Sequence, residues 1–127
     1  MLRDNDAMAT IAVREVDVAR DFYGGKLGLN ELPSENSGVL IYQSGHSKLQ
    51  VYRSEYAGTN RATAATWIVS EDLKAIVETL KSKGVTFEHY DLPALTLQDD
   101  IYVGDGFSVV WFKDPDSNIL SVIQPAG

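Results

Sequence analysis

The sequence predicts an α+β protein made of two repeated βαβββ modules that share one hydrophobic core. Its 127 residues suffice for one core and are few for two independent domains. The order of apolar strand, amphipathic helix and further strands occurs twice. An offset of 56 residues aligns Ala9 with Ala65, Thr10 with Thr66, Val13 with Val69, Ala19 with Ala75, and Gly28 with Gly84. We expect a single domain over residues 1–127, with modules at 8–55 and 64–124.

The first module begins with a strand at residues 8–13, which are small or β-branched. A helix follows, because apolar residues recur at one-face spacing: Ala19, Phe22, Tyr23 and Leu27. Asp17 is its expected N-cap, and Gly28 ends it. Strands are predicted at 39–43 and 48–53, where alternation puts Leu49 and Val51 on one face.

The second module repeats this order. Residues 65–69 predict a strand, Asp72 lies in a capping segment, and Gly84 stops a helix. The apolar face of that helix is Leu73, Ile76, Val77 and Leu80. Further strands are predicted at 85–90, 107–113 and 118–123. A type I turn with Pro115 joins the last two. At an offset of 71 residues, Leu49-Gln50-Val51 matches Leu120-Ser121-Val122.

Charge and composition exclude several classes of function. Eleven Lys and Arg against eighteen Asp and Glu leave a net charge of −7, which argues against a nucleic-acid partner. The absence of cysteine excludes thiolate nucleophiles, disulfides and iron–sulfur clusters. No apolar run approaches the length of a membrane span, and the N-terminus lacks a signal-like apolar region. We expect a cytoplasmic protein with no membrane partner.

Two motifs resemble those of the vicinal-oxygen-chelate superfamily, which includes glyoxalase I, bleomycin-resistance proteins and extradiol dioxygenases. Residues 13–29 resemble its opening V-x-D-x-x-x-A-x-x-FY-x-x-x-LG pattern, and residues 111–120 its closing F-x-DPDGN-x-L pattern. The similarity covers residues 8–124. It implies a paired half-barrel, with each sheet curved around a cleft and its helix packed behind. It also implies a homodimer, because many such proteins share the cleft between two chains.

Family members that use a metal carry His or Glu at four positions. Carried onto this chain, these positions fall at Met8 or Ala9, at Ala65 or its neighbours, and at Gln50 and Ser121. None is a strong ligand for a divalent transition metal. The two histidines are expected elsewhere, His46 in a turn and His89 on a solvated strand edge. The resemblance therefore indicates a subgroup without the metal ligands, and we expect neither a metal nor a cofactor.

The cleft is then expected to bind a small molecule through polar and aromatic side chains. The candidate ligand-binding residues are Gln50, Tyr52, Trp67, Tyr102, Trp111 and Ser121. Trp67 is the first choice, because it has the parity of Ala65 along its strand. No catalytic residue can be assigned.

An acidic stretch suggests which ligand is preferred. Residues 86–112 contain no Lys or Arg but include Glu88, Asp91, Asp99, Asp100 and Asp105. Within this stretch, residues 92–106 are interpreted as a mobile flap. An acidic rim beside an aromatic cleft favours a cationic aromatic ligand, as bleomycin-resistance proteins sequester a basic drug. The leading hypothesis is a metal-independent binder, and the alternative is a lyase, isomerase or dioxygenase-type enzyme of the same superfamily.

Overall fold

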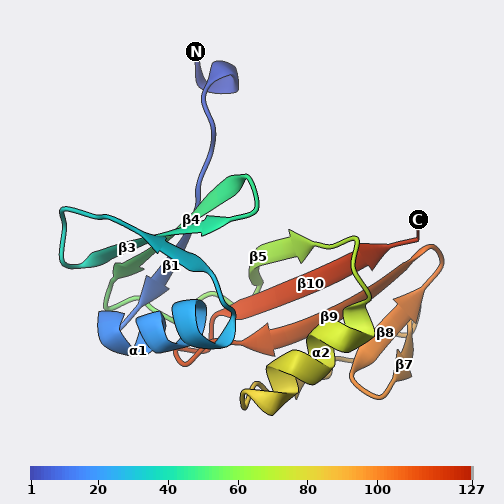
Figure 1. Cartoon of the computed structure of the whole chain (residues 1–127). Coiled ribbons are helices and arrows are strands. Elements are labelled where there is room, and N and C mark those ends of the chain that lie inside the picture. The colour runs from blue at the N-terminus through green and yellow to red at the C-terminus, as the bar shows by residue number, and fades with distance from the viewer. Residues whose placement is uncertain (127) are drawn as a thin grey trace.

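The computed structural model describes residues 1–126 as two β-sheets with their helices on one side (Figure 1). Helix α1 (Val16–Arg20) and helix α2 (Leu73–Ser82) lie below the strands in this view. The N-terminal segment, with the short 3₁₀ helix η1 (Leu2–Asp4), extends away from the sheets. The face of each sheet opposite the helices is called the open face below.

The first sheet has the strand order β1-β4-β3-β2. Its strands are β1 (Ala9–Val13), β2 (Asn30–Leu32), β3 (Val39–Ser44) and β4 (Ser47–Arg53). Strands β1 and β4 are parallel, whereas the other neighbours are antiparallel. Leu49 and Val51 are buried on the helix side, which confirms the alternation predicted for this strand. Strand β2 was not anticipated.

The second sheet has the order β5-β10-β9-β8-β7. In addition, β6 pairs with the end of β9 that lies away from the β8–β9 turn. Its strands are β5 (Thr63–Ile68), β6 (Phe87–Glu88), β7 (Thr96–Gln98), β8 (Ile101–Gly104), β9 (Phe107–Lys113) and β10 (Ile119–Pro125). The parallel pair β5–β10 occupies the place that β1–β4 has in the first sheet. The repeat seen in the sequence is thus a repeat of topology.

The helix sides of both sheets contribute to one continuous hydrophobic core. Phe22, which lies in the helical stretch after β1, packs against Phe112 of β9 with ring centroids 6.4 Å apart. Phe112 in turn meets Phe87 edge-on at 5.8 Å. Because side chains from both modules are buried in the same cluster, neither module encloses its own core.

The first helix is shorter and less regular than the sequence predicts. Helix α1 gives way at Asp21 to a π-helical segment, η2 (Asp21–Lys26), which places Phe22 and Tyr23 in the core. The expected cap at Asp17 is wrong: the N-cap position is Glu15, and its side chain makes no capping hydrogen bond. Gly28 has a positive φ of 74°, which explains why glycine ends this segment.

The second helix agrees closely with the prediction. Asp72 is its N-cap, and its carboxylate accepts a hydrogen bond of 3.0 Å from the backbone N–H of Lys74. Leu73, Val77 and Leu80 are buried, as their spacing indicates. The chain leaves the helix through Gly84 at a φ of 88°.

The flap predicted over residues 92–106 is wrong, because this segment contains the β7–β8 hairpin, and β8 pairs with β9. The glycines there have structural causes. A Cβ on Gly104 would lie 2.7 Å from the Phe107 ring and 2.8 Å from Leu95, so close packing requires glycine at this position. Gly106 has a φ of 88° in the β8–β9 turn. The strand predicted at 85–90 is reduced to β6.

Candidate functional site

The two open faces carry equivalent polar pairs at their parallel strands. Thr10 of β1 is the register partner of Gln50 of β4, and Thr66 of β5 is the partner of Ser121 of β10. Thr10 and Thr66 are also the residues that the 56-residue repeat aligns. Directly paired residues on neighbouring strands point to the same face. The first-strand position is therefore Thr10 in the first module, and not Met8 or Ala9. In the second module it is Thr66, one of the neighbours of Ala65 that the prediction includes.

The second of these pairs forms a direct contact. Thr66 Oγ1 and Ser121 Oγ are 2.7 Å apart, and either hydroxyl can donate. Ser121 is only 3% exposed, whereas Thr66 is exposed. The pair thus offers a ligand one accessible hydroxyl whose orientation is fixed by a buried neighbour.

The donors at the four equivalent positions do not fit a divalent transition metal. They supply three hydroxyl groups and one carboxamide: Thr10, Gln50, Thr66 and Ser121. These metals bind imidazole, carboxylate or thiolate far more strongly. Across residues 1–126, moreover, no three His, Asp or Glu side chains are grouped closely enough to hold an ion. These four side chains therefore make a poor site for such a metal.

An aromatic group lies on the open face of the second sheet, beside the hydroxyl pair. Trp111 is the register partner of Ser121 and is half-buried. Its ring meets Tyr90 edge-on at 5.8 Å and Tyr102 at 5.5 Å. The indole N–H donates to Thr63 Oγ1 at 3.2 Å, so the plane of the ring is held from two sides.

Tyr102 is a buried member of this aromatic group. Its side chain is 2% exposed, and its hydroxyl donates to the carbonyl oxygen of Tyr90 at 2.8 Å while accepting from the Tyr90 N–H. A phenol engaged in this way cannot bind a ligand without giving up both bonds. Tyr90, which is 36% exposed and was not singled out from the sequence, presents the accessible edge instead. Burial raises the pKa of the Tyr90 phenol, and the Glu88 carboxylate raises it further.

Trp67 lies on the other face of the second sheet. Its register partner is the core residue Val122, and the repeat aligns it with the buried Ile11 of β1. Its indole N–H donates to Ser44 Oγ at 2.8 Å and so links the two sheets. Trp67 and Ala65 do lie on the same face of β5, but this face is the one that packs against the core. The structure therefore does not bring Trp67 together with Ser121 and Trp111.

Gln50 and Tyr52 lie on the open face of the first sheet. Gln50 is half-buried, and Tyr52 is 38% exposed. Ile41 and Val39 of β3 are their neighbours on this face by register. Both side chains are available to a ligand or to a second chain.

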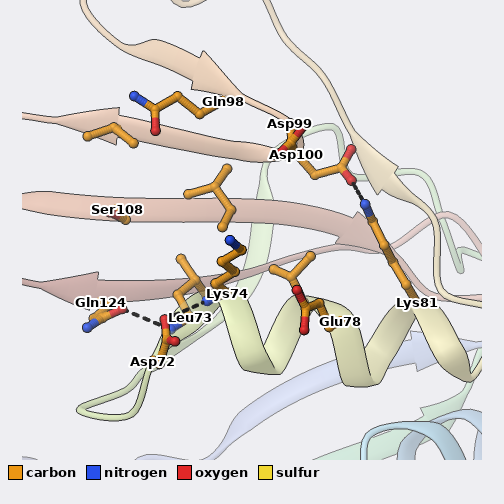
Figure 2. Close-up of a pocket in the computed structure, with 13 residues that line it drawn as sticks. Asp72, Leu73, Lys74, Glu78, Lys81, Gln98, Asp99, Asp100, Ser108 and Gln124 are labelled. Atoms are coloured by element: carbon orange, nitrogen blue, oxygen red, sulfur yellow. Dashed lines mark hydrogen bonds and ion pairs between the residues drawn. The ribbon is translucent and has the colours of Figure 1, made fainter.

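The acidic residues predicted to form one rim are divided between the two faces. Glu88 is the register partner of Trp111 and lies 3.4 Å from the Lys113 amine. Asp99 and Asp100 instead border a hollow of about 320 Å³ between α2 and the β7–β8 hairpin, on the helix side (Figure 2). There the Asp100 carboxylate is paired with Lys81 and also lies 2.8 Å from His89 Nε2. Only part of the acidic stretch therefore adjoins the aromatic group.

The hollow in Figure 2 is lined by polar and apolar groups in about equal measure, and its own residues satisfy several of its charges. At one end Lys81 reaches Asp100. At the other end Gln124 Oε1 accepts a hydrogen bond of 2.9 Å from the Leu73 N–H, which leaves that N–H unavailable to a ligand. The contacts at its two ends thus connect α2 to the second sheet, and the hollow is not the site predicted from the sequence.

In the described part of the chain, no helix is long and apolar enough to cross a membrane. No curated protein sequence matches the chain at a significant level. Solved structures match almost its whole length. A glyoxalase family protein from Enterococcus faecalis superposes with a TM-score of 0.72 at 18% identity, covering 97% of this chain and 99% of that one.

Two further structures have more specific descriptions. A lactoylglutathione lyase from Agrobacterium tumefaciens gives a TM-score of 0.68 at 13% identity, covering 94% of this chain and 93% of that one. A fosfomycin resistance protein from Listeria monocytogenes gives a TM-score of 0.71 at 11% identity, covering 94% of this chain and 92% of that one. At these identities the likeness shows a shared fold. The family is shown by the sequence itself: the model of the glyoxalase/bleomycin resistance protein/dioxygenase superfamily matches residues 7–122, so the chain belongs to this superfamily.

Proposed function

We propose that this protein binds a small cationic aromatic molecule, without a metal, on the open face of the second sheet. The observation that carries the proposal is the position of Trp111 between the Thr66–Ser121 hydroxyl pair and the exposed edge of Tyr90. An aromatic ligand can stack on such a ring and accept or donate one hydrogen bond at Thr66.

The cationic preference rests on Glu88 and on the electron-rich rings. Glu88 lies in register with Trp111, and its only close cation among the described residues is Lys113 at 3.4 Å. A ligand ammonium placed over Trp111 would gain from the ring and from the Glu88 carboxylate together. The net charge of −7 attracts cations to the molecule as a whole.

A second copy of the chain completes the site in this proposal. The open faces leave large apolar side chains in solvent, with Ile68 76% exposed and Tyr52 38% exposed. Ile68 follows Thr66 by two residues along β5 and so lies on the same face of the strand. Covering these side chains with another open face would enclose the ligand and remove apolar surface from water.

The ligand preference is tested with two probes that share one ring system, 2-naphthylmethylammonium and 2-naphthoate, titrated by calorimetry. The amine is expected to bind at least tenfold more tightly than the carboxylate. Trp111→Leu should remove this binding, while Tyr56→Leu, which alters an exposed ring elsewhere, should leave it unchanged. Equal binding of the two probes would remove charge as the selecting feature. Binding that survives Trp111→Leu would place the ligand elsewhere.

Metal independence is tested on protein purified without a histidine tag. Elemental analysis followed by thermal unfolding with added divalent ions should reveal no stoichiometric ion and no large stabilisation. A bound ion that raises the unfolding temperature strongly would overturn this part of the proposal. It would favour the alternative, a lyase, isomerase or dioxygenase-type enzyme.

A further inference from the structure

Two adjoining hollows lie between the end of η2 and one side of α2, on the helix side of the molecule. We call them together the inter-helix groove. The outer hollow has about 300 Å³ and the inner one about 160 Å³. Leu27, Ile76 and Leu80 line both hollows, so the two lie on either side of these side chains. The outer hollow is at the lower end of the range of small-ligand sites, and the inner one is large enough only for part of a ligand.

The inner hollow is apolar. Leu27 and Leu29 of the first module face Trp67, Val69 and other apolar side chains of the second module across it. Several of these residues are only partly buried although they pack against the core. Among the described residues that line it, Ser44 supplies a hydroxyl, and this hydroxyl already accepts a hydrogen bond from Trp67. The inner hollow therefore suits a hydrocarbon chain or ring and has little to offer a polar group.

The charges of the outer hollow are separated along α2. Lys26 and Lys83 lie at the end where the helix stops, and Glu71 and Asp72 lie at the end where it begins. The Lys26 amine is close to Gly84, at 3.7 Å from the position of a Cβ there. Within residues 1–126, neither lysine forms an ion pair, whereas Lys81 on the same helix is paired with Asp100. Two cations without partners thus stand beside an apolar cavity in a protein of net charge −7.

The position of the lysines relative to the inner hollow matters. Lys26 directly precedes Leu27, and Lys83 is three residues beyond Leu80, on the same side of the helix. Leu27 and Leu80 are the side chains at the junction of the two hollows. An anionic group at the lysines therefore places an attached apolar chain over the opening of the inner hollow.

We infer that the inter-helix groove is a second binding site, for an amphiphile with one carboxylate and an apolar chain or ring. The carboxylate lies between Lys26 and Lys83, and the apolar part enters the cavity lined by Leu27, Ile76 and Trp67. The acidic end at Glu71 and Asp72 fixes this orientation and disfavours a ligand that carries a carboxylate at both ends. The site differs from that of the proposed function in face, in residues and in the sign of the ligand charge.

The test is calorimetric titration of the full chain with decanoate, below its micelle concentration, against decylammonium and decanedioate. Decanoate is expected to bind saturably with one site per chain, and at least tenfold more tightly than either of the others. The double variant Lys26→Gln/Lys83→Gln should weaken decanoate at least tenfold, because both partners of the carboxylate are lost. Ala75→Glu, at an exposed position of the outer hollow, should weaken it as well.

The matched control is Lys48→Gln/Lys74→Gln, which changes the net charge equally at two lysines that also lack ion pairs among the described residues but lie outside the groove. This variant should bind decanoate like the unaltered chain. The inference is overturned if decanoate does not bind saturably, if the control loses as much affinity as the groove variant, or if decylammonium binds equally well. Binding of 2-naphthylmethylammonium should be unaffected by the groove variant, so each proposal can fail independently.

Discussion

The phenol of Tyr23 donates a buried hydrogen bond of 2.7 Å to Asp114 Oδ2 and thereby joins η2 to the turn between β9 and β10. The other oxygen of Asp114 accepts from the backbone N–H groups of Asp116 and Asn118, each at 2.9 Å. Asn118 in turn donates from its amide to Asp114 and to the carbonyl oxygen of Ala12 in β1. The tyrosine of the opening motif and the turn of the closing motif thus hold the two modules together.

We expect Tyr23→Phe to lower the free energy of unfolding by about 1–3 kcal/mol, because the buried Asp114 carboxylate loses a hydrogen-bond donor that water cannot replace. Urea denaturation followed by circular dichroism measures the change. Tyr56→Phe removes a phenol that is 70% exposed and should leave the midpoint unchanged. An unchanged midpoint for Tyr23→Phe would show that this bond does not contribute to stability.

Tyr42→Phe should raise the free energy of unfolding, whereas Tyr23→Phe lowers it. The Tyr42 hydroxyl is buried and has no hydrogen-bond partner among residues 1–126, although its ring packs 6.2 Å from that of Tyr23. Removing an unsatisfied buried hydroxyl relieves a desolvation cost, so Tyr42→Phe should stabilise the protein by about 1 kcal/mol. The same urea experiment checks this. Destabilisation would mean that the hydroxyl has a partner, such as an ordered water molecule.

Alkaline pH should unfold the protein partly through these two tyrosines. Burial, aided by the Asp114 carboxylate, raises the pKa of Tyr23, and burial raises the pKa of Tyr42 to about 12. The folded state then holds both protons more tightly than the unfolded state, whose tyrosine pKa is about 10. Their contribution to stability is complete below that value and is lost as the pH rises toward the folded values. Between about pH 9 and about pH 12, the double variant Tyr23→Phe/Tyr42→Phe should lose less stability than the unaltered chain.

Asp100 should anchor the β7–β8 hairpin to α2. Its hydrogen bond with Lys81, and a second with His89, lower the pKa of this carboxyl. The stability that the ionised Asp100 carboxylate contributes is therefore fully present above the ordinary carboxyl pKa and is lost as the pH falls through the lowered pKa. At neutral pH, Asp100→Asn should accelerate hydrogen exchange of the β7 and β8 amides by about threefold or more. Asp99→Asn, at the adjacent turn residue, should not, and equal effects would assign the anchoring to turn geometry instead.

Ile68→Asp should shift the chain from dimer to monomer, because it places a charge among the exposed apolar side chains of the open face that we propose a second copy covers. Light scattering during size-exclusion chromatography measures the mass. Val18→Asp changes an exposed apolar residue on α1 and should leave the mass unchanged. A monomeric unaltered chain at high concentration would contradict the proposal directly.

Local patterns were enough to predict most of the fold. Helix α2 follows from the spacing of Leu73, Val77 and Leu80 together with the cap at Asp72, all within a few turns of chain. The β7–β8 hairpin could not be found in this way. The sequence predicts a mobile segment over residues 92–106, whereas the Phe107 ring and Leu95 pack against Gly104, and such contacts form only in the folded sheet.

The candidate site was less accessible to the sequence. Alternation along β10 predicts that Ser121 faces the cleft, on the side opposite Leu120 and Val122. The face of Trp111 follows only from the register of β9 against β10, which pairs it with Ser121. Trp67 was assigned to that face through Ala65, and the register of β5 against β10 shows that both face the core. A one-residue change of register moves every side chain of a strand to the opposite face.

Residue types and spacing are enough to predict the α+β class, the repeated module and the lack of strong metal ligands at Gln50 and Ser121. These depend on residue type and on spacing within a single element. Only the tertiary structure decided that Thr66 meets Ser121, that Tyr90 is the accessible ring of the aromatic group, and that two lysines border an apolar groove. The physical reason is that each of these depends on strand register and on packing between modules, which join residues distant in the chain.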